Sequence, residues 1–338
     1  MTDGLYDGET GRLSPERAQE AAALLERALY EMKKVIVGQQ DLLERLLIAL
    51  MAQGHALVEG APGLAKTLML KSLAQALSVG FKRIQFTPDL LPSDLIGARI
   101  FNPATGEFAT EPGPLFTNFV LADEINRAPA KVQSALLEAM QERQITVGRQ
   151  TFALEAPFLV MATQNPIESE GTYALPEAQL DRFLFKLLAA YPDAREEAVI
   201  VQRMTGADIP QISPVLDADA LLRLCDWVGK VYIDPALAHG IVDLIQATRR
   251  PPTNALTRAI QFGASPRGSL ALTMASKAMA LMRGRDYVRS EDVTALAHDC
   301  LRHRIILSYE GLAAGMTPDS FLDELLTLLP PPGASRGA

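Results

Sequence analysis

The sequence has few residues of the kinds that build metal sites or disulfide frameworks, with two cysteines and four histidines among 338 residues. Cys225 and Cys300 each fall inside an apolar helical pattern, and no second cysteine or histidine stands at a metal-ligand spacing. We interpret both as buried structural thiols. His298 and His303 are the closest pair of histidines, but their spacing does not suit one helical face. We therefore assign these residues no metal or disulfide chemistry.

Long apolar runs and an excess of positive charge are also missing. The most apolar stretches, residues 42–52 and 184–190, are well short of the roughly 20 apolar residues that a membrane-spanning helix needs. The amino-terminal segment lacks the basic and apolar regions of a secretory signal, so we expect a cytoplasmic protein. A net charge of −8 offers no broad electrostatic footprint for nucleic acid, although a local basic patch on one face of an oligomer stays open.

The composition, with 48% hydrophobic and 21% charged residues, is ordinary for a globular protein, and the length allows about two domains. Short apolar runs, separated by helical segments or Gly/Pro-rich turns, predict five buried strands at residues 56–59, 83–86, 119–122, 158–162 and 183–187. Strands that alternate with helices predict a parallel sheet covered by helices.

Helical patterns occupy most of the remaining sequence. Ser14 is a candidate N-cap with Pro15 at the first helical position, and a second helix is predicted over 41–53. After about residue 191 strand-like runs vanish, and helical spacing is found at residues 194–204, 218–231, 235–247, 269–283 and 290–307. We therefore predict an α/β domain over 14–191, a linker and connecting helix over 192–212, and a small all-α domain over 213–329. Residues 1–13 and 330–338 are expected to be flexible tails.

The strongest motif lies between the first predicted strand and a helix-favouring run, and comprises Gly60, Ala61, Pro62, Gly63, Leu64, Ala65, Lys66, Thr67 and Leu68. In such a loop the glycines let backbone N–H groups turn toward phosphate oxygens, and the helix N-terminus adds its dipole. Lys66 would reach the outer phosphates, and Thr67 would ligate Mg²⁺. Ala65 stands where the usual pattern has glycine, so the backbone there must reach its conformation with a methyl group attached.

A second motif consists of Asp123 and Glu124, which directly follow the apolar strand predicted at 119–122. Sites in α/β proteins lie at such strand ends. Asp123 is expected to hold Mg²⁺, directly or through water, and Glu124 to orient and polarise the attacking water. Taken alone, each motif has a simpler interpretation, a Gly/Pro turn with a surface lysine or a solvated acidic turn. Their order and spacing favour one site for ATP and Mg²⁺.

With these motifs the chain resembles the AAA+ superfamily, and within it the MoxR family of ATPases, from about Val35 to Leu328. The resemblance implies a P-loop NTPase fold, an αβα sandwich on a parallel five-stranded core sheet, followed by a small all-α lid domain. Val37 and Gly38 belong to the stretch before the first strand, which in the family packs against the adenine.

Three further residues take their roles from this resemblance alone. Asn165 is similar to the sensor-1 residue and would contact the γ-phosphate and the water. Arg182 matches the arginine that reaches into the neighbouring subunit's ATP, and Arg267 resembles sensor 2, which would link the lid to the γ-phosphate. The simpler interpretations are a turn-forming asparagine before a proline, a surface Asp–Arg pair, and a plain Ser-Pro helix start.

Two inserts narrow the subclass. Residues 97–113 are expected to interrupt the second helix of the fold, and residues 144–157 contain two alternating runs that predict a β-hairpin. Both resemble pore-facing elements of the insert-bearing AAA+ clade, which also includes magnesium-chelatase subunits and replicative helicases. Arg127 and Arg143 fit subunit contacts and a solvated helix face equally well.

The resemblance implies an ATP-driven homo-oligomeric ring, expected to be a hexamer, because an arginine that reaches a neighbour's ATP requires adjacent subunits. The resemblance to the MoxR family further implies a chaperone function on protein clients, commonly with a von Willebrand factor A-type partner. Three alternatives stay open: a magnesium-chelatase-like motor subunit, a nucleic-acid translocase, and a nucleotide-dependent scaffold with little turnover. The acidic charge, with Arg149 as the one cation at the predicted hairpin tip, disfavours the translocase. The full set of candidate catalytic residues disfavours the scaffold.

Overall fold

The computed structural model describes residues 11–103, 106–165, 172–205 and 210–329, which divide into two compact units. Unit 2 contains the described residues of Arg27–Arg182 and of Leu187–Leu222. Unit 1 contains the described residues up to Glu26, Phe183–Lys186, and the described residues from Arg223 onward. The domain boundaries expected from the sequence stay a prediction, and the expected tails lie largely outside the described residues.

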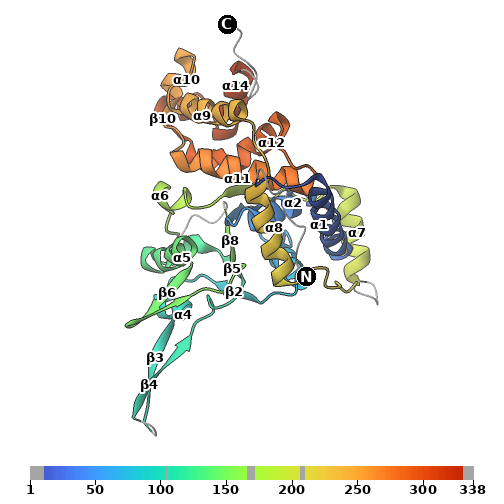
Figure 1. The fold of residues 1–338 in the computed structure, drawn as a ribbon. Coiled ribbons are helices and arrows are strands. Elements are labelled where there is room, and N and C mark those ends of the chain that lie inside the picture. Colours follow the sequence, from blue (N-terminus) through green and yellow to red (C-terminus); the bar gives the residue numbers. More distant parts are fainter. Residues whose placement is uncertain (1–10, 104–105, 166–171, 206–209, 330–338) are drawn as a thin grey trace. The chain divides into compact units, whose positions relative to one another are not determined.

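The core sheet has five strands: β1 (Ala56–Glu59), β2 (Phe81–Gln85), β5 (Phe119–Asp123), β8 (Leu159–Gln164) and β9 (Phe185–Leu188). Their order is β2-β5-β8-β1-β9, and the first four pair in parallel (Figure 1). The central strands β5 and β8 are buried along almost their whole length, because helices cover both faces of such a sheet. The predicted α/β fold with a parallel five-stranded core sheet is therefore confirmed, and each strand end lies within two residues of its predicted position.

Several helices precede the carboxy-terminal helical half, and a local sequence signal marks the start of the first one. Their bounds are α1 (Pro15–Val35), α2 (Gln40–Met51), α3 (Lys66–Ala76), η1 (Ile125–Arg127), α5 (Ala130–Glu142), α6 (Glu177–Leu180) and α7 (Ala194–Thr205). At the start of α1, the Ser14 hydroxyl accepts a hydrogen bond from Arg17 N at 3.4 Å, as the N-cap pattern predicts. Helix α5 buries Val132, Leu136 and Met140 at helical spacing, so it covers the core with one face.

Two hairpins extend the α/β part. The first follows the short helix α4 (Pro92–Ile96) and consists of β3 (Gly97–Asn102) and β4 (Glu107–Pro112), within the segment predicted as an insert. It projects away from β2, β5 and β8 (Figure 1) and exposes Phe101 and Phe108, whose ring centroids are 5.2 Å apart. The second, β6 (Gln144–Val147) with β7 (Gln150–Ala153), is the predicted hairpin before β8.

The carboxy-terminal half is mainly helical. Its elements are α8 (Ala218–Lys230), α9 (Pro235–Arg249), α10 (Asn254–Ala259), β10 (Ile260–Phe262), α11 (Pro266–Met282), α12 (Ser290–Leu301), η2 (Arg302–Arg304), β11 (Ile306–Leu307), α13 (Tyr309–Ala313) and α14 (Pro318–Leu328). Helix α11 packs against α9 and α12. The helix predicted over 290–307 was too long, because the chain leaves α12 at Leu301 and pairs β11 with β10. None of the helices in the described ranges is long and apolar enough to cross a membrane.

Three consecutive basic residues of unit 1 hold the main chain of 183–186. Arg304 Nη2 donates to Phe183 O at 2.8 Å, and Arg302 Nη1 donates to Lys186 O at 2.7 Å. The ring nitrogen Nε2 of His303 lies 3.1 Å from the same Phe183 oxygen. These contacts explain why a short segment that includes the start of β9 belongs to the helical unit.

Candidate active site

The loop between β1 and α3 has the backbone conformation that its sequence requires. Gly63 has a φ of +85°, in the left-handed region where glycine carries no penalty. Ala65 directly precedes α3 with a φ of +53°, so it adopts the left-handed conformation despite its methyl group. No side chain caps this helix start, which leaves the first N–H groups of α3 for another acceptor.

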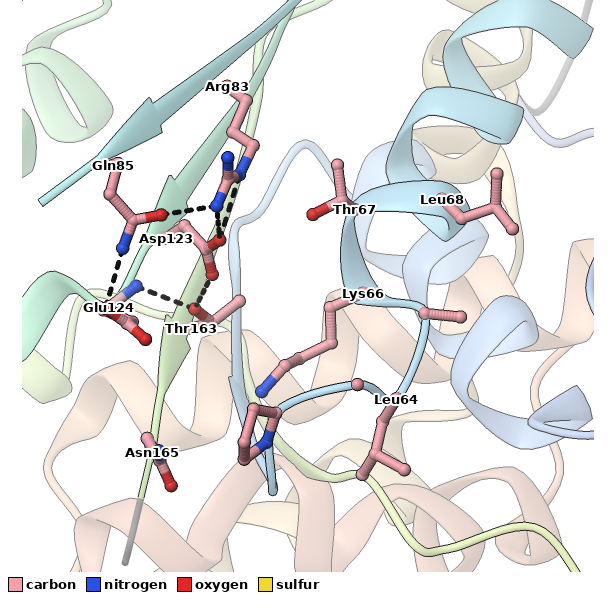
Figure 2. A pocket seen from close by; sticks show the side chains of 13 residues that line it. Leu64, Lys66, Thr67, Leu68, Arg83, Gln85, Asp123, Glu124, Thr163 and Asn165 are labelled. Atoms are coloured by element: carbon pink, nitrogen blue, oxygen red, sulfur yellow. Dashed lines mark hydrogen bonds and ion pairs between the residues drawn. The ribbon is translucent and has the colours of Figure 1, made fainter. Parts of the chain in front are cut away.

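A cavity of about 440 Å³ opens beside this loop (Figure 2). The loop contributes residues 62–68, and the sheet contributes Arg83 and Gln85 from β2, Asp123 and Glu124 from the end of β5, and Thr163 and Asn165 from the end of β8. Because β1, β2, β5 and β8 are parallel, their carboxyl ends meet at this edge of the sheet. The two motifs identified in the sequence thus line one cavity.

Lys66, the first residue of α3, points its amine into the cavity (Figure 2). Its Nζ donates to Gly60 O at 2.7 Å, so the amine closes back over the loop. Burial lowers the pKa of Lys66, while the negative charges of Asp123 and Glu124 act to raise it. The amine is therefore only partly solvated and has two carboxylates across the cavity.

The two acids are held by a network from neighbouring strands. The Thr163 hydroxyl donates to Asp123 Oδ1 at 2.6 Å and accepts from Glu124 N at 2.9 Å. Glu124 has a φ of +57°, an uncommon conformation for a residue with a side chain. Gln85 Nε2 donates to Glu124 Oε2 at 2.7 Å, and Arg127 Nε lies 3.2 Å from the same oxygen. Glu124 is thus fixed through both its backbone and its carboxylate.

A smaller, largely apolar pocket of about 90 Å³ adjoins the cavity and shares Gly63, Leu64, Ala65 and Leu68 with it. Val37 lines this pocket, and its role beside a base stays a prediction. Gly38 does not line it, but its φ is +66° and a Cβ there would lie 2.6 Å from Glu196 Oε1. Gly38 therefore shapes the turn that carries Val37. Gly60 and Ala61 are not among the described residues that line the cavity, and a Cβ on Gly60 would approach that of Ala189 to 2.8 Å.

The structure places the remaining candidate residues as follows. Arg182 follows α6 and is not among the described residues that line the cavity, and its Nε is buried without a hydrogen-bond partner in the described part of the chain. Arg267 lies in unit 1 at the start of α11, where its N–H donates to Ser265 Oγ at 3.1 Å. Arg143 Nη2 donates to Gln53 O at 2.6 Å. The roles of Arg182 and Arg267 stay predictions.

Sequence reasoning missed Arg83, Gln85 and Thr163. A signal for two of them existed, because Arg83 and Gln85 are polar residues two apart in a strand predicted to be apolar, and alternate residues share one face. Thr163 stood beside Asn165 without any signal of its own. Its role depends on the pairing of β8 with β5, which places it next to the two acids.

The residues present fit a nucleotide with magnesium. The cavity offers an amine at Lys66, a hydroxyl at Thr67 and a carboxylate at Asp123, and the adjoining pocket offers apolar walls. The described residues contain no group of three or more His, Cys, Asp or Glu that could hold a metal by itself. A magnesium ion here would therefore complete its oxygen ligands from water and phosphate, as Mg²⁺ does at nucleotide sites.

Comparison with protein families gives two matches. Residues 55–185 match a model described as the ATPase family associated with various cellular activities (AAA). Residues 253–325 match the AAA lid domain. The first range includes the loop, both acids and Asn165, and the second includes Arg267.

Individual proteins are similar over nearly the whole chain. Chaperone MoxR1 of Mycobacterium tuberculosis is 50% identical over 333 residues, covering 96% of this chain and 88% of that protein. Protein MoxR of Methylorubrum extorquens is 32% identical, covering 89% and 92%. A solved structure from Cytophaga hutchinsonii, described as a candidate ATPase, superimposes with a TM-score of 0.88 at 45% identity and covers 93% of this chain and 97% of its own. The chain therefore belongs to the MoxR family of AAA+ ATPases.

Proposed function

We propose that this chain binds ATP with Mg²⁺, hydrolyses it, and uses the energy to remodel or activate a partner protein. The single observation that carries the proposal is the common cavity of Lys66, Thr67, Asp123 and Glu124 at the carboxyl edge of a parallel sheet. A cationic loop and two carboxylates meet there at the start of a helix without a side-chain cap. This arrangement suits a triphosphate and its metal, because each charged group gains an opposite partner.

The loop would bind the phosphates and the smaller pocket the base. The first N–H groups of α3 have no side-chain cap and could donate to phosphate oxygens. Within the described residues Lys66 Nζ donates to the loop carbonyl of Gly60, which a phosphate oxygen could replace. Val37 and Leu68 offer apolar surface for the base. The four residues shared by the two pockets would then lie along the sugar and the first phosphate.

Glu124 would orient and polarise the attacking water, and Asn165 would contact that water and the γ-phosphate. Glu124 suits this role because Gln85 and the Thr163 hydroxyl hold it in one orientation at the cavity wall. Magnesium held by Thr67 and Asp123 would neutralise charge that develops on the phosphate oxygens. Asp123 would keep its position through its hydrogen bond from Thr163.

The assembly would be a homo-oligomeric ring, expected to be a hexamer, in which Arg182 reaches the ATP of the neighbouring subunit. Two features support a role in trans. Arg182 does not line the cavity of its own chain, within the described residues, and its Nε is a buried donor without a partner there. A guanidinium supplied in this way stabilises the transferring phosphoryl group and contributes about 10³–10⁵ in rate. Arg267, in the lid, would sense the γ-phosphate.

The client would be a protein, with a von Willebrand factor A-type partner as the expected helper. The relative MoxR1 carries the name chaperone, which supports a protein client. The hairpin β3–β4 would contact the client, because it exposes the ring pair Phe101 and Phe108. Exposed aromatic side chains of this kind are common at protein–protein contacts.

The test is replacement of Glu124 by glutamine. The variant should bind a fluorescent ATP analogue as tightly as the parent, because Lys66, Thr67 and Asp123 are unchanged. Its steady-state phosphate release should fall by about 10²–10⁴-fold, the usual contribution of a general base. Glu138→Gln, the same change at an exposed position of α5, is the matched control and should hydrolyse ATP like the parent. Unchanged turnover in Glu124→Gln would remove Glu124 from the mechanism, and absence of nucleotide binding by the parent would overturn the proposal.

A further inference from the structure

The carboxylate of Asp123 is already engaged by two neighbouring side chains. Thr163 Oγ1 donates to Oδ1 at 2.6 Å, while Arg83 donates to Oδ2 through Nε at 3.0 Å and through Nη2 at 2.7 Å. A carboxylate offers about four acceptor directions, two on each oxygen. Three are used here, and both of those on Oδ2 belong to Arg83. Counting the contacts of the described residues, one direction, on Oδ1, is left for a further ligand.

Arg83 comes from the strand next to Asp123 and is held in a defined orientation (Figure 2). β2 is the edge strand of the sheet and pairs with β5 so that Gln85 lies opposite Asp123, two residues beyond Arg83. Nη2 of Arg83 also donates to Gln85 Oε1. The guanidinium thus lies between a carboxylate and an amide on one face of β2 and forms part of the cavity wall.

This ion pair is open to exchange. The Arg83 side chain is 46% exposed and that of Asp123 16%, so water reaches the guanidinium from the cavity. An ion pair exposed to this degree contributes little to stability, because solvent screens it and can replace it. Water can therefore solvate the Arg83 guanidinium when a cation of higher charge binds Asp123.

We propose that Arg83 is a positioning residue that holds Asp123 Oδ2 in place of the metal and releases it when Mg²⁺ enters with the nucleotide. This rests on the proposed function, in which Asp123 and Thr67 hold Mg²⁺. A divalent cation and a guanidinium at one oxygen repel each other, so occupation of Asp123 by the metal disfavours the Arg83 contact. Arg83 thereby keeps Asp123 oriented in the empty site and raises the magnesium concentration that the site requires.

The test measures Mg²⁺ dependence rather than turnover. A fluorescent, non-hydrolysable ATP analogue is titrated with Mg²⁺ against the full chain and against Arg83→Gln, and its affinity is also measured in EDTA. The magnesium concentration for half-maximal metal-dependent binding should fall by about threefold to tenfold in Arg83→Gln, the effect expected from loss of one partly exposed charged contact. The affinity in EDTA should change by less than that, because Arg83 is engaged with Asp123 when no metal is present.

Lys82→Gln is the matched control. It removes the same charge from the adjacent residue of β2, whose side chain is exposed and points to the other face of the strand. Its magnesium requirement should equal that of the parent. Arg83→Lys keeps the charge but not the paired donors, and should give an intermediate value. If Arg83→Gln fails to fold, as judged by its thermal unfolding, Arg83→Lys carries the test alone.

Three results would overturn the inference. An unchanged or raised magnesium requirement in Arg83→Gln would mean that Arg83 does not compete with the metal, as would an equal fall in Lys82→Gln. A crystal structure with Mg²⁺ and nucleotide that retains both Arg83 contacts to Oδ2 would do the same. Failure of the parent to bind nucleotide at all would instead overturn the proposed function on which the inference rests.

Discussion

Each unit contains an Asp–Arg cluster, an aspartate that accepts hydrogen bonds from arginine, Asp292 in unit 1 and Asp123 in unit 2, but the two carboxylates differ in burial and in the number of bonds they accept. In unit 1, Asp292 is fully buried and accepts four hydrogen bonds, from Arg283, from both Nη atoms of Arg285, and from Arg289 N. In unit 2, Asp123 lines a cavity and accepts three, with a half-exposed arginine as its partner. The fully buried carboxylate of Asp292, with all four acceptor directions used, stabilises its unit, whereas the carboxylate of Asp123 lines a cavity and has an exchangeable partner.

The same contrast holds for two helix starts. The N-cap of helix α11 in unit 1 is Ser265, whose side chain accepts from Arg267 N and so satisfies one of the helix's free N–H groups. The N-cap of helix α3 in unit 2 is Ala65, which has no acceptor in its side chain. Groups that the fold satisfies by itself are structural, and groups that it leaves available beside a cavity are where a ligand is expected.

The largest effect should come from making one change in both clusters. Asp292→Asn should lower the free energy of unfolding by about 3–5 kcal/mol, because it removes the buried charge on which Arg285, only 15% exposed, depends as its partner. Asp123→Asn should cost less than about 1 kcal/mol and instead remove Mg²⁺-dependent nucleotide binding. Urea unfolding followed by the fluorescence of Trp227, the one tryptophan of the chain and a residue of unit 1, measures the first effect.

Asp226→Asn, in the same unit, is the control for Asp292→Asn. Asp226 is 61% exposed and pairs with Lys230 on the surface of α8. Its effect should stay below about 0.5 kcal/mol. Equal losses of unfolding free energy in Asp292→Asn and Asp123→Asn would contradict this contrast, because both clusters would then contribute equally to stability.

A somewhat smaller effect concerns His55, a buried histidine of unit 2. Val160 N donates to its Nδ1 at 3.0 Å, and Nε2 lies 3.1 Å from Met140 O, so the neutral ring fits the site. Burial lowers the pKa of His55 from 6.5 to about 4; the bond to Met140 O opposes this shift and the charge of Arg143 adds to it. Between these pH values the unfolded chain binds more protons. Stability is therefore fully present above pH 6.5 and falls by about 3 kcal/mol as the pH drops to 4.

Urea unfolding of the parent and of His55→Gln at pH 7 and pH 5 measures this contribution. The parent should lose about 2 kcal/mol more than the variant over this interval. His239→Gln, at an exposed residue of α9, is the control and should behave like the parent. Unit 1 has a second buried histidine, His303, whose burial also lowers its pKa. Unlike His55, it has one ring nitrogen, Nδ1, without a hydrogen-bond partner within the described residues. An equal pH dependence in the parent and His55→Gln would contradict the assignment.

The smallest effect is expected at the helix start without a cap. Ala65→Gly removes the methyl group from a left-handed residue and also increases the freedom of the unfolded chain. Because these contributions oppose each other, thermal unfolding should change by less than about 1 kcal/mol. Nucleotide affinity should be kept, since the N–H groups of α3 stay where they are. Loss of affinity would mean that the methyl group itself supports the loop.

Much of the fold followed from local sequence. Apolar runs predicted all five core strands, and the pattern from Gly60 to Thr67 predicted a phosphate-binding loop with an alanine in a conformation that glycine prefers. The end of α12 could not be predicted, because residues 302–307 have helical spacing but lie in η2 and β11. Their conformation depends on long-range pairing with β10, which no local pattern reveals.

Only some of the residues that line the cavity could be predicted from the sequence. Lys66 and Asp123 belong to contiguous motifs and were found, whereas the contacts of Arg83, Gln85 and Thr163 depend on how β2 and β8 align with β5. Register is a property of the whole sheet, so a single strand does not specify which side chains will meet. The roles of Arg182 and Arg267 depend on a second subunit and on the lid, and stay predictions.

A crystal structure of the chain with Mg²⁺ and a non-hydrolysable ATP analogue would show whether the loop and the two acids form one nucleotide site. We expect the triphosphate against residues 60–68, the metal between Thr67 and Asp123, and the base beside Val37. A nucleotide bound elsewhere, or a cavity that stays empty at saturating analogue, would contradict this expectation.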